Sequence, residues 1–350
     1  MSNKIILHSS DLDGYLTESD KSKIRKVDEL YKKTLESCRL LSEDKNNPKA
    51  VEMLVENSAE IGNYLREVVS KEKNIHVYCF ETAQVQHGAV SRIIAKLRNP
   101  KTDHEEFLYY IQRAYETLFA HTFSDPSLPS KRSVITETPV DFPCKNFAVH
   151  KIPDTDALTG NSVMCVMLRG ALLPSMIISK EIQDYSSNSY ITPFALFKIK
   201  RDDSRSETDM EYVLDLDKSY FSKEELDGKD WIFADPMNAT GGSFVTIVKY
   251  LKGIGLKPRK IIFINVMSTL KGSLRIIRAI ENCSLYTLWM DPILNEKAYI
   301  IPGLGDAGDR LNGKDLPGKP RNIIQLIADY GATITNLYRE QVEKIENTVL

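Results

Sequence analysis

The sequence lacks two features that would mark common protein classes. It contains no Gly-x-x-x-x-Gly-Lys-Ser/Thr motif, which argues against an ATPase or kinase domain. It also contains no apolar run that approaches the roughly 20 residues of a membrane-spanning helix. The apolar stretch close to Met1 is too short for a signal peptide. We therefore expect no association with a membrane.

Charge of one sign and paired cysteines are also scarce. The formal net charge is only −2, so no global field draws the chain to nucleic acid or to an anionic membrane. The cysteines lie far apart, without the spacing of a metal site or a disulfide framework. They are Cys38, Cys79, Cys144, Cys165 and Cys283. A reduced, cytoplasmic compartment is the simplest interpretation.

The beginning of the chain has a helical pattern. Between residues 20 and 72, apolar residues recur at spacings of three and four, which predicts two helices. The segment 44–48 (Asp-Lys-Asn-Asn-Pro) is a turn signal between them. This region is a solvated helical pair packed on the main domain or, alternatively, a module that binds a partner.

From residue 162 onward, short apolar runs alternate with helical patterns. Continuous apolar runs are typical of strands that are buried on both faces, as in a parallel sheet. The runs lie at 163–168, 194–199, 231–234, 261–266 and 285–289, with an earlier short strand at 76–80. Strands that alternate with helices predict an α/β fold with a doubly wound, mostly parallel sheet. An antiparallel strand is expected at 133–140, a polar loop from 202 to 223, and a further helix at 323–337.

The segment after the strand at 231–234 is suited to holding a phosphate. It combines an acid at the strand end with a Thr-Gly-Gly-Ser turn that opens a helix, where backbone N–H groups and hydroxyls are available to a dianion. In full it reads Asp235, Pro236, Met237, Asn238, Ala239, Thr240, Gly241, Gly242 and Ser243. The alternative is an ordinary glycine-rich turn. In an open α/β sheet, ligands bind at this end of the strands.

Two arginines also follow predicted strands. Arg169 comes directly after the run at 163–168, and Arg201 closes the run at 194–199. An arginine at the carboxyl end of such a strand faces the ligand crevice, and its planar fork suits pyrophosphate. Each arginine alone is a weak signal, because surface loops often begin with a charged residue.

The segment 299–310 (Tyr-Ile-Ile-Pro-Gly-Leu-Gly-Asp-Ala-Gly-Asp-Arg) offers main-chain groups more than side chains. Its glycines give it too much backbone freedom for a helix or a central strand. Main-chain donors and acceptors of this kind can recognise the edge of a flat base on which hydrogen-bond acceptors alternate with a donor. Asp306 lies between glycines and can reach a magnesium ion or its waters.

Together these segments resemble the uracil phosphoribosyltransferase family over about residues 76–313. The segment 291–296 (Asp-Pro-Ile-Leu-Asn-Glu) adds to the likeness. The resemblance implies a type I phosphoribosyltransferase fold for this range. Beyond it, the chain has an extra helical extension at 1–75 and a helical tail at 314–350, whereas family members commonly end soon after the 299–310 segment. The resemblance also implies that Arg169 and Arg201 contact the pyrophosphate of phosphoribosyl pyrophosphate (PRPP), and that 235–243 hold its ribose and 5′-phosphate. By the same resemblance, uracil is bound by Tyr299, Ile300, Gly305, Asp306 and Ala307.

The implied reaction joins uracil to PRPP and yields UMP and diphosphate, a step of pyrimidine salvage. By the same resemblance, Arg169, Arg201, Asp235 and Asp306 are the catalytic residues. Mg²⁺ is the implied cofactor, GTP an effector, and a homodimer or homotetramer the assembly. Residues 1–72 contain none of this chemistry, so we expect a chain that begins near Lys73 to keep uracil transfer.

The sequence departs from the family at the first arginine. The family pattern Leu-Arg-Ala-Gly-Leu is Leu-Arg-Gly-Ala-Leu here, at residues 168–172, and the glycine before the tyrosine is Ala298. These changes leave two other hypotheses open. One is a non-catalytic sensor of PRPP or a nucleotide that uses its helical extensions to bind a partner. The other is a phosphoribosyltransferase for a different base.

Overall fold

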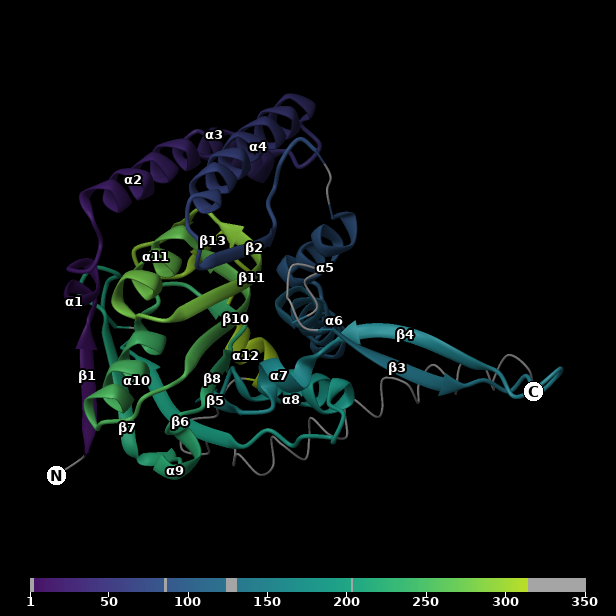
Figure 1. The fold of residues 1–350 in the computed structure, drawn as a ribbon. Helices are drawn as coiled ribbons and strands as arrows, with labels where there is room; N and C mark the ends of the chain where they lie inside the picture. Colours follow the sequence, from purple (N-terminus) through teal and green to yellow (C-terminus); the bar gives the residue numbers. More distant parts are fainter. Residues whose placement is uncertain (1–2, 85–86, 124–130, 203, 314–350) are drawn as a thin grey trace.

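A computed structural model of the chain describes residues 3–84, 87–123, 131–202 and 204–313 (Figure 1). Its helices are α1 (Ser9–Asp13), α2 (Glu18–Lys32), α3 (Thr34–Glu43), α4 (Pro48–Ser70), α5 (Gly88–Arg98), α6 (His104–Phe123), α7 (Thr155–Thr159), α8 (Leu172–Tyr185), α9 (Lys223–Leu226), α10 (Gly242–Gly253), α11 (Leu270–Ala279) and α12 (Ala307–Asn312). Among them, none is long and apolar enough to cross a membrane. The helix predicted at 323–337 lies outside the described residues.

The strands form one central sheet and two small ones. They are β1 (Lys4–His8), β2 (Ile75–Cys79), β3 (Lys131–Glu137), β4 (Phe147–Pro153), β5 (Ser162–Leu168), β6 (Phe194–Arg201), β7 (Glu211–Tyr220), β8 (Asp230–Ala234), β9 (Met237–Asn238), β10 (Lys260–Thr269), β11 (Cys283–Asp291), β12 (Ile293–Leu294) and β13 (Ile300–Ile301). The order in the central sheet is β1-β7-β6-β5-β8-β10-β11-β2, and β9 pairs with β10. β12 pairs with β13, and β3 and β4 form a ribbon that projects from the body of the molecule (Figure 1).

The central sheet is mostly parallel, as the alternation of strands and helices predicts. Six neighbouring strands from β6 to β2 run parallel, whereas β7 is antiparallel to both β6 and β1. Helices α6 and α8 pack on one face, and α10 and α11 pack on the other (Figure 1). Both faces are therefore covered, and every residue of β8 is buried. The predicted α/β doubly wound fold is confirmed.

Two expectations about individual elements need correction, and one strand was not anticipated. The region 20–72 contains three helices rather than two, because the first predicted helix is interrupted at Lys33, between α2 and α3. The segment expected to be a polar loop from 202 to 223 contains β7. The first residues of the chain form β1, which pairs with β7 through residues 4–8 and belongs to the central sheet. The division of the chain at residue 75 stays a prediction.

Candidate functional site

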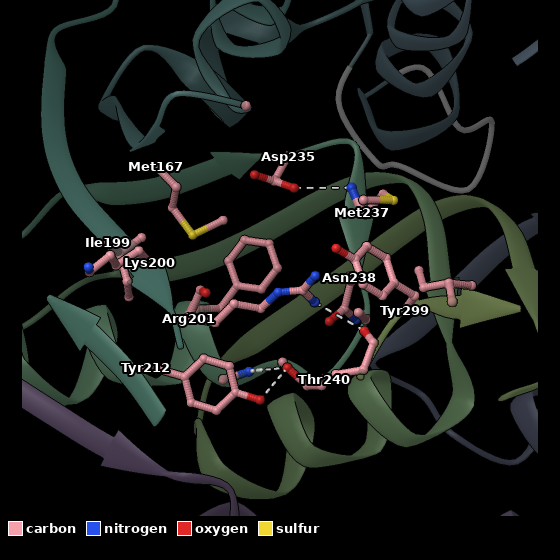
Figure 2. Close-up of a pocket in the computed structure, with 18 of the residues that line it drawn as sticks. Met167, Ile199, Lys200, Arg201, Tyr212, Asp235, Met237, Asn238, Thr240 and Tyr299 are labelled. Carbon is pink, nitrogen blue, oxygen red and sulfur yellow. Dashed lines mark hydrogen bonds between the residues drawn. The ribbon is translucent and has the colours of Figure 1, made fainter. Parts of the chain in front are cut away.

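A cavity of about 270 Å³ opens at the carboxyl ends of β5, β6 and β8 (Figure 2). Three segments that the sequence analysis singled out meet there. The predicted site residues on its wall are Arg201, Asp235, Met237, Asn238, Ala239, Thr240, Gly241, Gly242, Ser243, Tyr299, Ile300 and Asp306. The other predicted residues, Arg169, Pro236, Gly305 and Ala307, lie in the same segments but not on this wall. Met167 and Asp306, which are 139 positions apart in the chain, thus line one site.

The turn before α10 has the backbone that a phosphate loop needs. Gly241 has a φ of 77°, a left-handed conformation that favours glycine, and α10 begins at the next residue. Gly242 packs beneath the ring of Tyr212 so closely that a Cβ atom there would lie 2.2 Å from it. The hydroxyl of Tyr212 donates to Thr240 Oγ1 at 2.6 Å (Figure 2). The N-terminus of α10 is therefore held open to the cavity, where backbone N–H groups can receive an anion.

Asp235 follows the last residue of β8 and opens on the cavity. Its carboxylate accepts a hydrogen bond from the Met237 backbone N–H at 3.0 Å (Figure 2). Its own carbonyl oxygen accepts one from Asn265 Nδ2 at 2.8 Å. Burial raises the pKa of Asp235 to about 7, the negative charge of Asp306 adds to this effect, and the Met237 N–H opposes it. Asp235 and Asp306 thus bring two carboxyl groups to one cavity.

Arg201 connects the end of β6 with the loop that contains Tyr299. Its Nη1 donates to the Ala298 carbonyl at 3.1 Å. Its guanidinium carbon lies 4.8 Å from the centre of the Tyr299 ring, which is a cation–π contact (Figure 2). The arginine is therefore oriented by the same loop that was predicted to bind the base.

Arg169 lies beside the cavity and against α12. Its Nη1 donates to the Gly313 carbonyl at 3.4 Å, and its Nη2 lies 3.8 Å from Asp309 Oδ1. Gly170 stands where the family pattern has alanine. A Cβ atom on Gly170 would make only ordinary contacts, 3.8 Å from Gly308 Cα, so the loop has space for a side chain at this position. The predicted contact of Arg169 with pyrophosphate stays a prediction.

The loop from Ala298 to Asp306 is shaped by two acceptors outside it. Asn295 Oδ1 accepts from the Tyr299 N–H at 2.9 Å. Asp291 Oδ2 accepts from the Gly303 N–H at 2.9 Å. Gly303 has a φ of 63°, and a Cβ atom there would lie 2.1 Å from the Ile300 carbonyl oxygen, so no larger residue fits.

Asp306 has a structural role in addition to its predicted one. It is the N-cap of α12, and its Oδ1 accepts from the Asp309 N–H at 2.9 Å. One residue thus ends the base loop, begins α12 and places negative charge in the cavity.

Sequence reasoning missed Tyr212, which lines the cavity from β7. The charged residues around it favoured a loop, and the alternation that marks a strand covers only about four residues, with Tyr212 and Leu214 buried. Lys200 also lines the cavity, although only its neighbour Arg201 was assigned a role. The basic pair at the end of β6 was the available signal for Lys200.

Comparison with known proteins identifies the family. A protein of Dictyoglomus thermophilum named uracil phosphoribosyltransferase is 43% identical over 96 residues, which are 27% of this chain and 45% of that protein. The alignment therefore spans less than half the length of that relative. A protein of the same name from Campylobacter concisus is 28% identical over 229 residues, which are 65% of this chain and 95% of that protein. One from Campylobacter jejuni is 28% identical over 241 residues, 68% and 98% of the two chains.

The family model described as uracil phosphoribosyltransferase matches residues 84–313. This range contains every residue assigned to the site and nearly coincides with the range of the resemblance seen in the sequence. The prediction of the family is therefore confirmed, and the chain belongs to the uracil phosphoribosyltransferase family.

Proposed function

We propose that this chain transfers the phosphoribosyl group of PRPP to uracil and forms UMP and diphosphate, a step of pyrimidine salvage. The observation that carries the proposal is the meeting of the 235–243 segment, Arg201 and the 298–306 loop around one cavity. The family match over the same residues supports it. In the reaction, the bond between C1′ and the diphosphate oxygen breaks, and N1 of uracil bonds to C1′ and loses its proton.

The donor half of the cavity suits a 5′-phosphate and a ribose. The N–H groups at the start of α10, with the hydroxyls of Thr240 and Ser243, can receive the dianion. Asp235 lies at the adjoining strand end, where its carboxylate can accept hydrogen bonds from the vicinal ribose hydroxyls. Arg201 and Arg169 then stabilise the charge that develops on the leaving diphosphate, while C1′ becomes oxocarbenium-like.

Tyr299, Ile300 and Asp306 line the part of the cavity that we assign to the base, and Gly305 and Ala307 adjoin Asp306 in the chain. Main-chain groups of this loop are available to the O4/N3 edge of a flat pyrimidine. Arg201 makes a cation–π contact with Tyr299 and donates to the Ala298 carbonyl. The arginine that we assign to the pyrophosphate is therefore in contact with the loop that we assign to the base. Contacts to the edge of uracil can make its N1 nucleophilic, so the proposal does not call for a strong general base.

Mg²⁺ fits this site as an ion that PRPP brings with it. The described residues contain no cluster of three or more His, Cys, Asp or Glu side chains that could hold a metal alone. Asp235 and Asp306 nevertheless face one cavity, where repulsion from Asp306 adds to the larger effect of burial in raising the pKa of Asp235. A divalent ion would relieve this repulsion, with donor oxygens and waters completing its oxygen ligands. When bound, it would neutralise negative charge on the diphosphate.

Base competition tests the proposal. Purified protein is given limiting PRPP, Mg²⁺ and equal uracil and cytosine, and the nucleotide products are separated by chromatography. Cytosine places an amino donor where uracil has the O4 acceptor, so a main-chain N–H would be left unpaired, at a cost of about 1–3 kcal/mol. We expect UMP to exceed CMP by at least about fivefold. We also expect 5-fluorouracil to be accepted, because its O4/N3 edge is unchanged.

Equal yields of UMP and CMP would refute the assignment of the base loop. Absence of any nucleotide product would refute phosphoribosyl transfer and favour a protein that only senses PRPP or a nucleotide.

The cytoplasmic location rests on the five cysteines, which are all unpaired. GTP as an effector and a homodimer or homotetramer stay predictions from the family resemblance.

A further inference from the structure

The segment proposed to hold the 5′-phosphate rests directly on α11. Thr269 Oγ1, at the N-cap of α11, donates to the Ala239 carbonyl at 2.6 Å. A Cβ atom on Gly272 would lie 2.4 Å from the same carbonyl oxygen, and one on Gly241 would lie 2.8 Å from the Gly272 carbonyl oxygen. The backbone at 239–241 and the backbone of α11 at Gly272 are therefore already in close contact. The position of the first turns of α11 therefore determines the position of the phosphate segment.

Arg275, in the middle of α11, is a charged residue with a side chain that is 0% exposed. Its Nη2 donates to Asp13 Oδ1 at 2.6 Å and to Ser9 Oγ at 3.3 Å. Its Nη1 donates to Glu207 Oε1 at 3.0 Å and to the Thr240 carbonyl at 3.4 Å. One guanidinium thus joins α1, the segment between β6 and β7, and the residue before Gly241.

The charges around Arg275 cancel within the cluster. Lys271 Nζ pairs with Glu207 Oε2 at 2.7 Å, so the ion pairs join two cations with the carboxylates of Glu207 and Asp13. A neutral cluster exerts little attraction on a distant phosphate. It instead holds its members in one geometry, because a buried guanidinium that loses a partner leaves an uncompensated charge. The cluster is therefore suited to positioning rather than to attracting the donor.

We propose that Arg275 is a positioning residue for the 5′-phosphate segment, and that Asp13, from α1, completes this arrangement. The inference rests on the proposed function, because it takes residues 240–243 as the phosphate site. Arg275 acts through the Thr240 carbonyl, which belongs to the peptide unit that leads into Gly241 and its left-handed backbone. The N-terminal residues of the chain are thereby part of the donor site, although they do not touch the donor.

Asp13→Asn tests this role, and Glu72→Gln is the matched control. Glu72 also lies before residue 75, and it pairs with Arg278, one turn further along α11, at 2.9 Å. Each variant converts one carboxylate to an amide and leaves its arginine a second carboxylate, Glu207 or Asp20. Within the described part of the chain, the side chain of Arg278 donates to Asp20 and Glu72 and not to residues 235–243, so the two variants differ in that connection. Thermal unfolding of both verifies that they fold.

The probes are ribose 5-phosphate and PRPP, with binding measured by calorimetry, together with steady-state KM and kcat on the full chain. For Asp13→Asn we expect the Kd of ribose 5-phosphate and the KM of PRPP to rise about fivefold, because the amide oxygen can still accept from Arg275 but no longer carries the charge that strengthens the contact. The KM of uracil and kcat should stay within about twofold. Glu72→Gln should leave all four constants within the same limit. Arg275→Lys, which keeps the charge but not the fork, should weaken ribose 5-phosphate binding at least as much as Asp13→Asn.

Opposite results would overturn the proposal. Tighter ribose 5-phosphate binding by Asp13→Asn would mean that Arg275 acts through its charge, since the variant makes the cluster more positive. Equal losses in Asp13→Asn and Glu72→Gln would mean a general effect of the N-terminal region. Unchanged binding by Asp13→Asn, with a wild type that binds ribose 5-phosphate and forms UMP, would refute the positioning role alone. A wild type that binds neither ribose 5-phosphate nor PRPP would refute the proposed function and this inference with it.

Discussion

At the scale of single residues, the two arginines that follow strands β5 and β6 meet the site in different ways. Arg201 lines the cavity, whereas Arg169 lies against α12 through Gly313 and Asp309. We expect Arg169→Lys to lower kcat/KM for PRPP by about 10- to 1,000-fold, because an ammonium cannot replace the planar fork that we propose to bind the pyrophosphate. Steady-state kinetics with varied PRPP measures the change.

Arg259→Lys is the control for this substitution. Arg259 forms a two-point contact with Asp230, at the start of β8 and so at the end of the strand away from the cavity. It should change stability but leave kcat/KM for PRPP within about twofold, since sites far from the chemistry are independent of it. Full activity of Arg169→Lys would assign Arg169 a structural role only.

At the scale of elements, the start of α10 depends on its close approach to β7. A Cβ atom on Gly242 would lie 2.2 Å from the Tyr212 ring, so Gly242→Ala must displace either the strand or the helix. We expect a loss of about 1–3 kcal/mol in the free energy of unfolding, the usual cost of overpacking. PRPP affinity should fall with it, because the helix start moves. Urea unfolding and calorimetry measure the two effects.

Gly253→Ala is the matched control, at the other end of α10. A Cβ atom on Gly253 meets nothing within 4 Å, and Gly253 is helical. This substitution should be neutral or stabilise the protein by up to about 1 kcal/mol, because alanine restricts the unfolded chain. If Gly242→Ala behaved like Gly253→Ala, the contact between α10 and β7 would not determine the site.

At the scale of the whole molecule, carboxylates hold the N-terminal helices on α11. Asp20 has a side chain that is 1% exposed and accepts hydrogen bonds from Arg278 at 3.0 Å. Burial alone would raise the pKa of Asp20, but the hydrogen bonds from Arg278 and Thr17 outweigh it and lower the pKa to about 2. We therefore expect the packing of these helices on α11 to weaken at low pH.

The direction of the pH dependence of stability follows from the lowered pKa of Asp20. The carboxyl group of an aspartate in an unfolded chain has a pKa of about 4. The stabilisation by Asp20 is therefore complete above that pH and is lost as the pH falls toward 2. We expect wild type to exceed Asp20→Asn by about 2 kcal/mol in unfolding free energy at pH 6, and the difference to shrink below pH 4. Urea unfolding across this range is the measurement. A difference that does not change with pH would contradict the role of the Asp20 charge.

For a chain that begins at Lys73, the contacts of α11 give a reason to expect the opposite of what the sequence suggested. Such a chain lacks β1 and the carboxylates of Asp13, Asp20 and Glu72, so Arg275 loses one of its two carboxylate partners and Arg278 loses both. Leaving a buried charge without its partner costs about 3–5 kcal/mol, so we expect the truncated chain to unfold or to lose PRPP binding. Circular dichroism and calorimetry test this. Uracil transfer by a folded truncated chain would show that the N-terminal region is dispensable.

The sequence by itself determined the central strands and the phosphate segment. Strands such as β5, β8 and β10 are buried on both faces, so each is a run of apolar residues that can be recognised without a neighbour. The segment from Asp235 to Ser243 is equally local, because its glycines and hydroxyls serve backbone conformations within one turn. The family resemblance rests on the same local segments.

Only the tertiary structure decided which residues outside those segments belong to the site. β7 has a short alternation among charged residues, and it becomes a strand because β6 and β1 pair with its two edges. Arg275 looks like any arginine of an amphipathic helix, and nothing near it in the chain predicts complete burial. Its partner Asp13 lies 262 positions away. A buried charge is stable only where distant acceptors meet it, and that meeting is a property of the folded chain.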